Sequence, residues 1–515
     1  MAKGVTRREA LKLSGLALGG LAVGGAMIGL GAGKIHADQT CDCPEGPTCT
    51  WTGDPSDTQQ YSYFKSLDLF HPYDQSTKTT IAPLGKDEMR ITFMGSCIPP
   101  VRRAQQMMSV FVEVGWDKKN ERPLDQFVFD CGSGVCANYG AMNVGFGRMD
   151  KIFLAHLHGD HMSDLTHIYC FGPSADRKSP LYVFGPGPSG VPNPGPNANR
   201  LPYYDDGTKA FCQNLREALR WHTESFSFQT TSYPGYPTRT QMQRKWGLPC
   251  KPVSVSDDPW GDAFGMVPIQ LDWTKYGRTP GDNVAYNNTK TGVKITHFPV
   301  IHCRKGSIGY KLEWNGLSMI YTSDTKPEIR SRDQAVNGGE GVDVLIHESV
   351  VPAQIWAMKN QHLSTPPPFD DPGVEALTTV QNSSHSPQGA FGYYLSQIKP
   401  PPRLTVVTHF PVANDTVTCA MQSVLDHNPN IEWGKDIIWS FDLMVIKVTP
   451  TQITQLQASV SDFGFSPTVN LPDGAANSPK YHYPDGSGNP FAQIDTSTAM
   501  PDCDGDKCNY RDDGY

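Results

Sequence analysis

Short apolar segments recur along the chain from about residue 89 to residue 450, and several alternate with polar positions. The segment "MRITFMGS" (89–96) alternates and ends at a glycine turn, which is typical of a β-strand. Further strands are predicted at 108–115, 126–134, 149–156, 180–190, 293–302, 309–316, 317–324, 342–349, 403–410 and 436–450. Helices are indicated at 210–222 and 386–398. Strands precede and alternate with helices in two halves, and this order predicts an α/β sandwich.

The domain organisation follows from where this pattern stops. One domain is predicted at 86–450, with a loop-rich insertion at about 190–290 and polar, turn-rich extensions at 38–85 and 451–515. The insertion is rich in large aromatic residues, namely Tyr203, Tyr204, Trp221, Trp246, Trp260 and Trp273. Insertions of this length are usually functional, so the aromatic residues either form a lid or pocket wall or fill a small satellite core. The sequence leaves both alternatives open.

The N-terminal segment 1–37 is predicted to be a targeting signal. Arg7 and Arg8 are followed by a mildly apolar stretch rich in glycine and alanine, which indicates a twin-arginine signal. Ala37 ends a small-residue site at which cleavage is expected, and an uncleaved anchor is the alternative. We therefore expect a periplasmic or secreted protein that meets the twin-arginine translocon during export.

The bulk composition bears on the partners. The 515 residues are 38% hydrophobic and 19% charged, which fits a soluble globular protein with a core. The formal charge of −8 supplies no basic face in bulk, and nucleic-acid binding usually needs one. A small-molecule substrate and no nucleic acid are therefore expected, and a homodimer is compatible with the sequence.

The 13 cysteines fit an exported protein. One group follows the signal and a second lies near the C-terminus, while the other eight are scattered and are expected to be small buried hydrophobic residues. Disulfides or a metal could join the terminal groups, and the lack of a CxxC pair or a nearby histidine favours disulfides. The terminal cysteines are Cys41, Cys43, Cys49, Cys503 and Cys508.

The segment "IFLAHLHGDHMSDL" (152–165) places three histidines and an aspartate within six residues. His156 and His158 are two positions apart at a strand end, so their side chains can point the same way. Asp160 and His161 follow a glycine that permits a turn. Neutral imidazoles and a carboxylate suit zinc, iron or manganese, and this set could serve two ions.

The motif "HLHGDH" resembles the HxHxDH signature of the metallo-β-lactamase superfamily. The resemblance covers about residues 87–450, with 190–290 unmatched, and points to the tRNase Z and arylsulfatase-like branch. It is carried by "MRITFMGSCIPP", "VFDCGSGV", "PLYVFGPGP", "SIGYKLEWNGLSMIYTSDTKP", "VLIHES", "SSHSP" and "LTVVTHF" in this order. The fold that it implies is a four-layer αβ/βα sandwich with a loop-rich insertion.

The resemblance also implies a set of seven metal ligands. His156, His158 and His302 match ligands of a first metal, and Asp160, His161 and His409 match ligands of a second. Asp324 matches a carboxylate that bridges both. Two divalent ions are expected, with zinc first and manganese or iron as alternatives.

Two such ions lower the pKa of a bridging water, so that hydroxide can attack an ester centre near pH 7. Asp160 is expected to orient this nucleophile as well as to bind metal. His385, in "SSHSP", is the candidate general acid, and a purely structural hydrogen bond is its alternative. His347 and Asp130 are expected to orient ligands from behind, although both could be ordinary polar residues at strand ends.

The expected function is an exported dinuclear hydrolase of a phosphodiester, sulfate ester, phosphotriester or lactone. A tRNase Z-like phosphodiesterase is one alternative. An iron-dependent redox enzyme on the same fold is another, although that branch is expected to carry glutamate where this chain has His158. A protein that binds without catalysis is the third, and the complete ligand set argues against it.

Overall fold

The computed structural model describes residues 67–72, 82–227 and 264–460, apart from 101, 178, 196, 197, 279 and 280, together with 485 and 487. The twin-arginine segment and the two terminal cysteine groups lie outside these residues, as do Trp246 and Trp260, so the predictions made for them stay predictions. No helix within the described part of the chain is both long and apolar enough to cross a bilayer.

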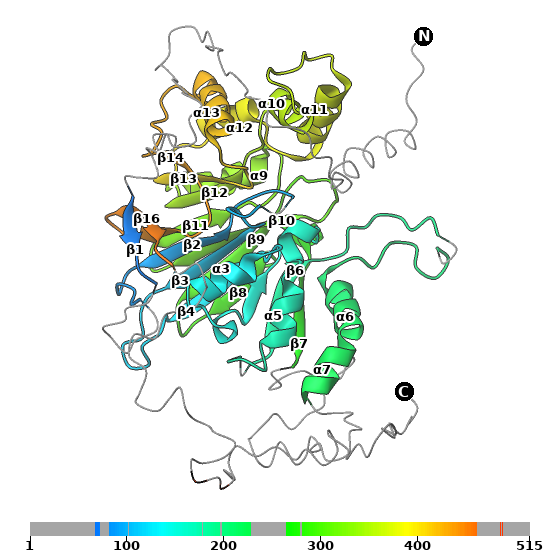
Figure 1. Ribbon diagram of the computed structural model, residues 1–515, viewed down its shortest axis with the longest axis vertical. Coiled ribbons are helices and arrows are strands. Elements are labelled where there is room, and N and C mark those ends of the chain that lie inside the picture. Colours follow the sequence, from blue (N-terminus) through cyan, green and yellow to red (C-terminus); the bar gives the residue numbers. More distant parts are fainter. Residues whose placement is uncertain are drawn as a thin grey trace.

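Two mixed sheets form the body of the protein (Figure 1). The first has nine strands in the order β1-β16-β15-β2-β3-β4-β5-β6-β7. Their bounds are β1 Asp68–Phe70, β2 Met89–Gly95, β3 Ser109–Val114, β4 Asp125–Phe129, β5 Lys151–Phe153, β6 Leu181–Pro186, β7 Met266–Leu271, β15 Met444–Val448 and β16 Ile453–Ala458. Strands β4 to β7 run parallel to one another, whereas β2 and β3 are antiparallel to their neighbours.

The second sheet has seven strands in the order β14-β13-β12-β11-β10-β9-β8. Their bounds are β8 Val284–Asn288, β9 Val293–Pro299, β10 Ile308–Trp314, β11 Leu317–Tyr321, β12 Val344–Glu348, β13 Leu404–Thr408 and β14 Ile437–Trp439. Strands β11 to β14 are parallel, and β9 runs the same way because β10 is antiparallel to both β9 and β11.

Helices cover the outer faces of both sheets. Figure 1 shows α3 and α5 in front of the first sheet, and α12 and α13 beside β13 and β14 of the second. The helices are α3 Val135–Ala141, α4 Gly159–Met162, α5 Leu165–Phe171, α6 Thr208–Ala218, α7 Arg220–Ser227, α9 Ile329–Val336, α10 Ala353–Asn360, α11 Pro372–Ser384, α12 Gln388–Ser396 and α13 Asn414–His427. Short 3-10 turns span Phe146–Arg148, Trp273–Lys275 and Asn337–Gly339.

Three buried clusters correspond to the three interfaces between these layers. On β3, Val110, Val112 and Val114 face the second sheet, while Phe111 packs with α3 and α5 on the outer side. On β12, Leu345 packs with α12 and α13, whereas its neighbours on the strand face the first sheet. Both faces of each sheet are therefore apolar, and the predicted four-layer αβ/βα sandwich is confirmed.

The sheets extend beyond the predicted domain limits. Strand β1 comes from the predicted N-terminal extension and β16 from the C-terminal one, and the two pair in parallel at one edge of the first sheet. Strands β7 and β8 come from the predicted insertion. Strand β7 forms an edge of the first sheet, and β8 forms an edge of the second. Strand β7 contains Pro268 and β8 ends in two asparagines, so the hydrophobic pattern gave little strand signal for either.

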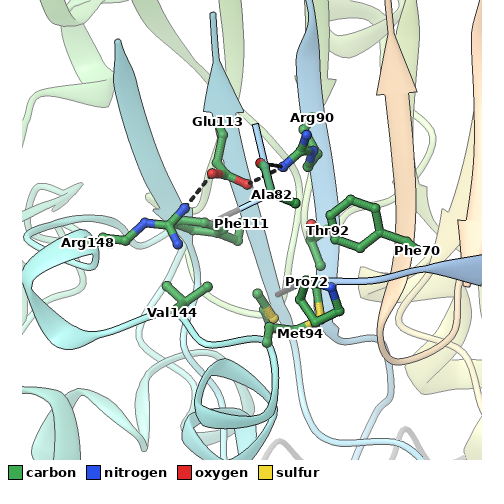
Figure 2. A pocket seen from close by; sticks show the side chains of 11 residues that line it. Phe70, Pro72, Ala82, Arg90, Thr92, Met94, Phe111, Glu113, Val144 and Arg148 are labelled. Carbon is green, nitrogen blue, oxygen red and sulfur yellow. Dashed lines mark hydrogen bonds and ion pairs between the residues drawn. The ribbon is translucent and has the colours of Figure 1, made fainter. Parts of the chain in front are cut away.

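A buried ion network holds the N-terminal extension on the first sheet (Figure 2). Arg90 on β2 donates to the carbonyl oxygens of Ala82 and Pro83, at 2.8 Å each, and pairs with Glu88 at 3.1 Å. Glu113 on β3 pairs with Arg148 and lies 3.8 Å from Arg90. Arg90, Glu113 and Arg148 line a small pocket together with Phe70, and because each of these charges is paired, burial is tolerated.

Candidate metal centre

The carboxyl ends of strands from both sheets meet at one edge of the sandwich. From the first sheet, β5 leads into the loop that carries His156 and His158, and α4 then carries Asp160 and His161. From the second sheet, three strands are followed closely by the remaining residues of the set. His302 follows β9, Asp324 follows β11 and His409 follows β13. The structure thus brings together all seven residues proposed as ligands.

Three of these histidines form what we call the first donor group, namely His156, His158 and His302. The Nδ1 atom of His158 lies 3.1 Å from Nε2 of His156 and 3.1 Å from Nε2 of His302. Nitrogen ligands of a tetrahedral zinc ion stand about 3.3–3.4 Å apart, given zinc–nitrogen bonds of about 2.0–2.1 Å. The spacing of the three nitrogens therefore fits one ion.

The other four residues form the second donor group, namely Asp160, His161, Asp324 and His409. Oδ2 of Asp160 lies 3.3 Å from Nε2 of His161 and 3.2 Å from Nε2 of His409. Asp324 closes the group, because its two carboxylate oxygens each lie 3.4 Å from one of these two imidazole nitrogens. Four donors at this spacing also fit one divalent ion.

Asp324 faces both groups. Its Oδ2 lies 3.7 Å from Nε2 of His302 and 4.0 Å from Nε2 of His156, as a bridging carboxylate would. Its Oδ1 and the nearby Nε2 of His161 are buried, and neither has a hydrogen-bond partner among the described residues. Buried polar atoms without partners are costly, and two divalent ions would satisfy them. The donor set therefore fits a dinuclear metal site.

Asp130 holds His161 from behind. This fully buried carboxylate accepts from Nδ1 of His161 at 2.8 Å and from the backbone amide of Ala155 at 2.8 Å. The Tyr321 hydroxyl donates to it at 2.6 Å and the Ser323 hydroxyl at 3.1 Å. Burial lowers the pKa of His161, but Asp324, Asp160 and Asp130 outweigh it and raise the pKa well above its ordinary value, so a metal ion at Nε2 would displace a proton. The bond from Nδ1 to Asp130 keeps Nε2 directed at that ion. The sequence singled out Asp130, but not Tyr321 or Ser323.

Backbone strain gathers at the same strand ends. Asp130, Ser323 and His409 have φ angles of +56°, +52° and +55°, in the left-handed region that favours glycine. A residue other than glycine pays of order 1–3 kcal/mol there. All three lie in or directly behind the donor groups, so the surrounding contacts stabilise conformations that the isolated chain would avoid.

Gly132 permits a close approach between β4 and α4. A Cβ atom at this position would lie 2.0 Å from the carbonyl oxygen of Asp160. The adjacent amide of Cys131 donates to the His161 carbonyl at 2.7 Å, and the Met108 amide donates to the Asp160 carbonyl at 3.1 Å. A side chain at 132 would displace the backbone that carries two candidate ligands.

His385, the candidate general acid, lies beside the donor groups and is oriented by Glu348. Its Nδ1 lies 2.9 Å from one oxygen of Glu348 and 3.1 Å from the other. The His385 ring centroid is 4.9 Å from that of His302 and 5.7 Å from that of His409. Its side chain is 15% exposed whereas that of Glu348 is fully buried, so His385 can meet both solvent and the centre.

The structure gives the orienting role expected for His347 to its neighbour. The His347 ring packs on Phe391 and Tyr394 of α12, on the outer side of the second sheet. Glu348 instead faces the centre, where it contacts His385 and lies 3.6 Å from Nδ1 of His409. Within the described part of the chain, His347 has no hydrogen bond or ion pair with a residue of either donor group, so the orienting role expected for His347 falls to Glu348.

The electrostatics of the centre suit cations. Burial lowers the pKa of His156 well below its ordinary value and that of His158 to about 4, so both are neutral, the form that binds metal. Burial also lowers the pKa of His409, but Asp324, Asp160 and Glu348 outweigh it and bring the pKa to about 10. The carboxylates thus create a negative potential that protons or metal ions would neutralise.

Comparison with known proteins gives short sequence matches. No family model matches the chain. Ribonuclease Z of Treponema denticola is 37% identical over 62 residues, which are 12% of this chain and 20% of that protein. Ribonuclease BN of Citrobacter koseri is 28% identical over 100 residues, which are 19% of this chain and 31% of that protein. The matches therefore span less than a third of these relatives.

Solved structures with similarity to the chain include the metallo-β-lactamase fold protein YhfI from Bacillus subtilis. It is 14% identical, with a TM-score of 0.39, over 70% of this chain and 100% of that one. The short form of human tRNase Z is 18% identical, with a TM-score of 0.38, over 70% of this chain and 99% of that one.

The sequence relatives overturn the prediction of a small-molecule substrate and no nucleic-acid partner, because they are ribonucleases. The net charge is a poor guide to a local binding surface, for a physical reason. A charge of −8 sums residues over the whole chain, whereas salt screens exposed charges beyond about 8–10 Å. Basic residues lie close in sequence to the candidate ligands, namely Lys305 after His302 and Lys326 after Asp324, while Arg304 between them pairs with Asp206.

Proposed function

We propose that this protein is a metal-dependent phosphodiesterase that hydrolyses RNA, and that it acts after export from the cytoplasm. The observation that carries the proposal is the pair of donor groups that share Asp324, with His385 beside them. A site of this kind suits attack of water on phosphorus. The short similarity to ribonucleases supports RNA as the substrate, and the twin-arginine pattern supports export.

Bound divalent ions would supply Lewis acidity toward the phosphoryl oxygens and lower the pKa of a water ligand. The first group offers three imidazole nitrogens and the second offers two imidazoles and a carboxylate, with Asp324 between them. Asp160 projects one carboxylate oxygen between His161 and His409. In this proposal its other oxygen accepts a hydrogen bond from the attacking water.

The leaving oxygen of the phosphodiester requires a proton, and in this proposal His385 donates it. Its Nδ1 is held by Glu348, so its Nε2 is the atom left to face the substrate. Burial lowers the pKa of His385, but the Glu348 carboxylate outweighs this effect and raises the pKa above its ordinary value. The protonated form therefore persists toward neutral pH, as a general acid needs.

A cleavage assay on end-labelled RNA tests the proposal. Zinc- and manganese-loaded protein is incubated with a single-stranded RNA and with a hairpin that carries a 3′ tail, and the product ends are mapped. We expect cleavage in the unaltered protein and none in Asp160→Ala. Asp117→Ala is the matched control, because Asp117 lies in the turn between β3 and β4, away from the donor groups.

A second substrate separates the proposed attack by water from attack by the 2′-hydroxyl of RNA. An RNA with one 2′-deoxynucleotide at the mapped site should still be cut there. Loss of cleavage at that position alone would contradict the mechanism, and RNA left intact by the metal-loaded protein would contradict the proposed substrate. Export is tested by fractionation of cells that carry an Arg7→Lys and Arg8→Lys double variant, which should keep the protein inside.

A further inference from the structure

We infer that Gln105 is a positioning residue that holds His409 in the second donor group. Gln105 lies on the loop between β2 and β3, far from His409 in sequence, and it belongs to neither donor group. Its role is to fix the backbone just after His409. This inference rests on the proposed function, because it treats His409 as a ligand.

The side-chain amide of Gln105 clasps the chain that follows His409. Its Nε2 donates to the Phe410 carbonyl at 3.1 Å, and its Oε1 accepts from the Val412 amide at 2.9 Å. The Phe410 amide in turn donates to the Ser96 carbonyl at 3.1 Å. Gln105 is 6% exposed, so water does not replace these bonds readily.

The backbone of His409 needs such support. Its φ of +55° lies in the left-handed region, although the residue is not a glycine. This conformation turns the chain sharply at the end of β13, so that the imidazole reaches Asp160 and Asp324 while Phe410 enters the core. Without the bonds to Phe410 and Val412, the segment would relax toward an ordinary φ and move the imidazole.

The loop that carries Gln105 is itself anchored. Nε2 of Gln105 also donates to the Ser96 hydroxyl at 3.0 Å, and that hydroxyl donates to Asp442 at 2.8 Å. Asp442 accepts further bonds from the Gln106 amide at 2.7 Å and from Asn138 at 2.8 Å. A continuous chain of bonds therefore links the segment after His409 to α3 and to the β14–β15 connection.

Metal affinity in Gln105→Leu tests the inference, measured on the whole protein by competition with a chelator. Substitution of a residue that orients a ligand typically weakens metal binding by about 10–100-fold. We expect this loss for one of two zinc ions, with the other ion unchanged. Gln106→Leu is the matched control, because the side chain of this neighbouring glutamine donates to the Arg102 carbonyl, at 3.4 Å, and not to the segment after His409.

Two further measurements separate positioning from general stability. The visible absorption of the cobalt-loaded protein should change in Gln105→Leu and not in Gln106→Leu, because it reports the coordination of the ion. In a His156→Ala background, which disables the first donor group, Gln105→Leu should weaken the remaining ion. If Gln105→Leu does not fold, Gln105→Met replaces it, since methionine is unbranched and of similar length and loses the same hydrogen bonds without adding a charge.

The inference is overturned if the Gln105 variants bind each ion as tightly as the Gln106→Leu control does. It is also overturned if the Gln105 variants weaken the binding of both ions to the same extent. Failure of the proposed function has a different signature, because the unaltered protein would then bind two ions without cutting RNA. An unaltered protein that does not bind two ions would remove the ligand role of His409 and the inference with it.

Discussion

Substitution of Asp130 by asparagine is expected to damage both stability and metal binding. One oxygen of Asp130 accepts from Ala155, and the other accepts from His161, Tyr321 and Ser323. An asparagine offers only one oxygen, so its amide nitrogen must face at least one donor. No rotation of the amide satisfies all four partners.

The magnitude follows from these contacts. The oxygen of the asparagine can stay with Ala155, and then His161, Tyr321 and Ser323 lose their acceptor. It can instead turn to those three, and then the Ala155 amide faces an N–H and the other donors bond a neutral oxygen in place of a carboxylate. A hydrogen bond to a charged group contributes about 1.5–3 kcal/mol, and an unsatisfied buried donor costs about 1–3 kcal/mol. We expect Asp130→Asn to lower the free energy of unfolding by about 3–6 kcal/mol.

The effect on metal binding comes through His161. Asp130→Asn removes the carboxylate that accepts from Nδ1 of His161 and leaves an amide N–H or a neutral oxygen there, so Nε2 is held less firmly toward the second donor group. We expect about 10–100-fold weaker binding of one metal ion. Urea unfolding of the metal-free protein gives the first quantity, and competition with a chelator gives the second.

Asp125→Asn is the matched control at the other end of β4. Asp125 is also buried, and it accepts from Tyr286 at 2.8 Å and from Asn288 and Thr291 at 3.1 Å each. It should lose stability while both metal affinities stay unchanged. The reasoning is refuted if Asp130→Asn keeps both ions at normal affinity, or if Asp125→Asn weakens metal binding to the same extent.

Four further predictions concern other parts of the site and its surroundings. Glu348→Gln should lower the pKa of His385, because the carboxylate now raises it; activity that needs protonated His385 then disappears at a lower pH as the pH rises, which a pH–rate profile would show. His347→Leu should leave metal affinity unchanged, since its ring packs on α12, and a loss in the chelator assay would restore its orienting role. Burial raises the pKa of Asp442 from 3.8 to about 7; the unfolded chain therefore binds fewer protons between these values, so stability should fall as the pH rises through this window, by at most about 1.4 kcal/mol per pH unit. Urea unfolding of Asp442→Asn at several pH values should lack this slope, and an unchanged slope would assign it to another group. Metal removal should lower Tm, since ligand at about 100 times its Kd stabilises by about 2.7 kcal/mol, and an unchanged Tm by calorimetry would contradict binding to the folded state.

Much of the fold and of the site could be predicted from the sequence. The alternation of apolar and polar residues in segments such as 89–96 located most core strands, because successive side chains of a strand point to opposite faces of the sheet. The cluster at 156–161 is dense enough to indicate a metal site by itself. His302, Asp324 and His409 are isolated in the sequence, and only the resemblance to a family marked them before the structure placed them together.

Other predictions failed where a global quantity or a weak pattern stood for local structure. The net charge led to the expectation of no nucleic-acid partner, whereas the sequence relatives are ribonucleases. The net charge is a sum over the whole chain, and salt screens exposed charges over much shorter distances than the size of the protein. Strands β1, β7, β8 and β16 were missed. Each lies inside a turn-rich or polar stretch that was interpreted as an extension or an insertion, and each pairs with a neighbouring strand of a sheet.

The sequence by itself determined the chemistry that is available, namely five histidines and two aspartates of the kinds that bind metal, with a sixth histidine for proton transfer. Only the tertiary structure decided which neighbours serve them. His347 and Glu348 are adjacent on β12, so their side chains point to opposite faces of the sheet. Both faces are covered in a four-layer sandwich, and therefore hydrophobicity could not indicate which face looks toward the centre. The packing of α12 against His347 settles it, and Glu348 is left to orient His385.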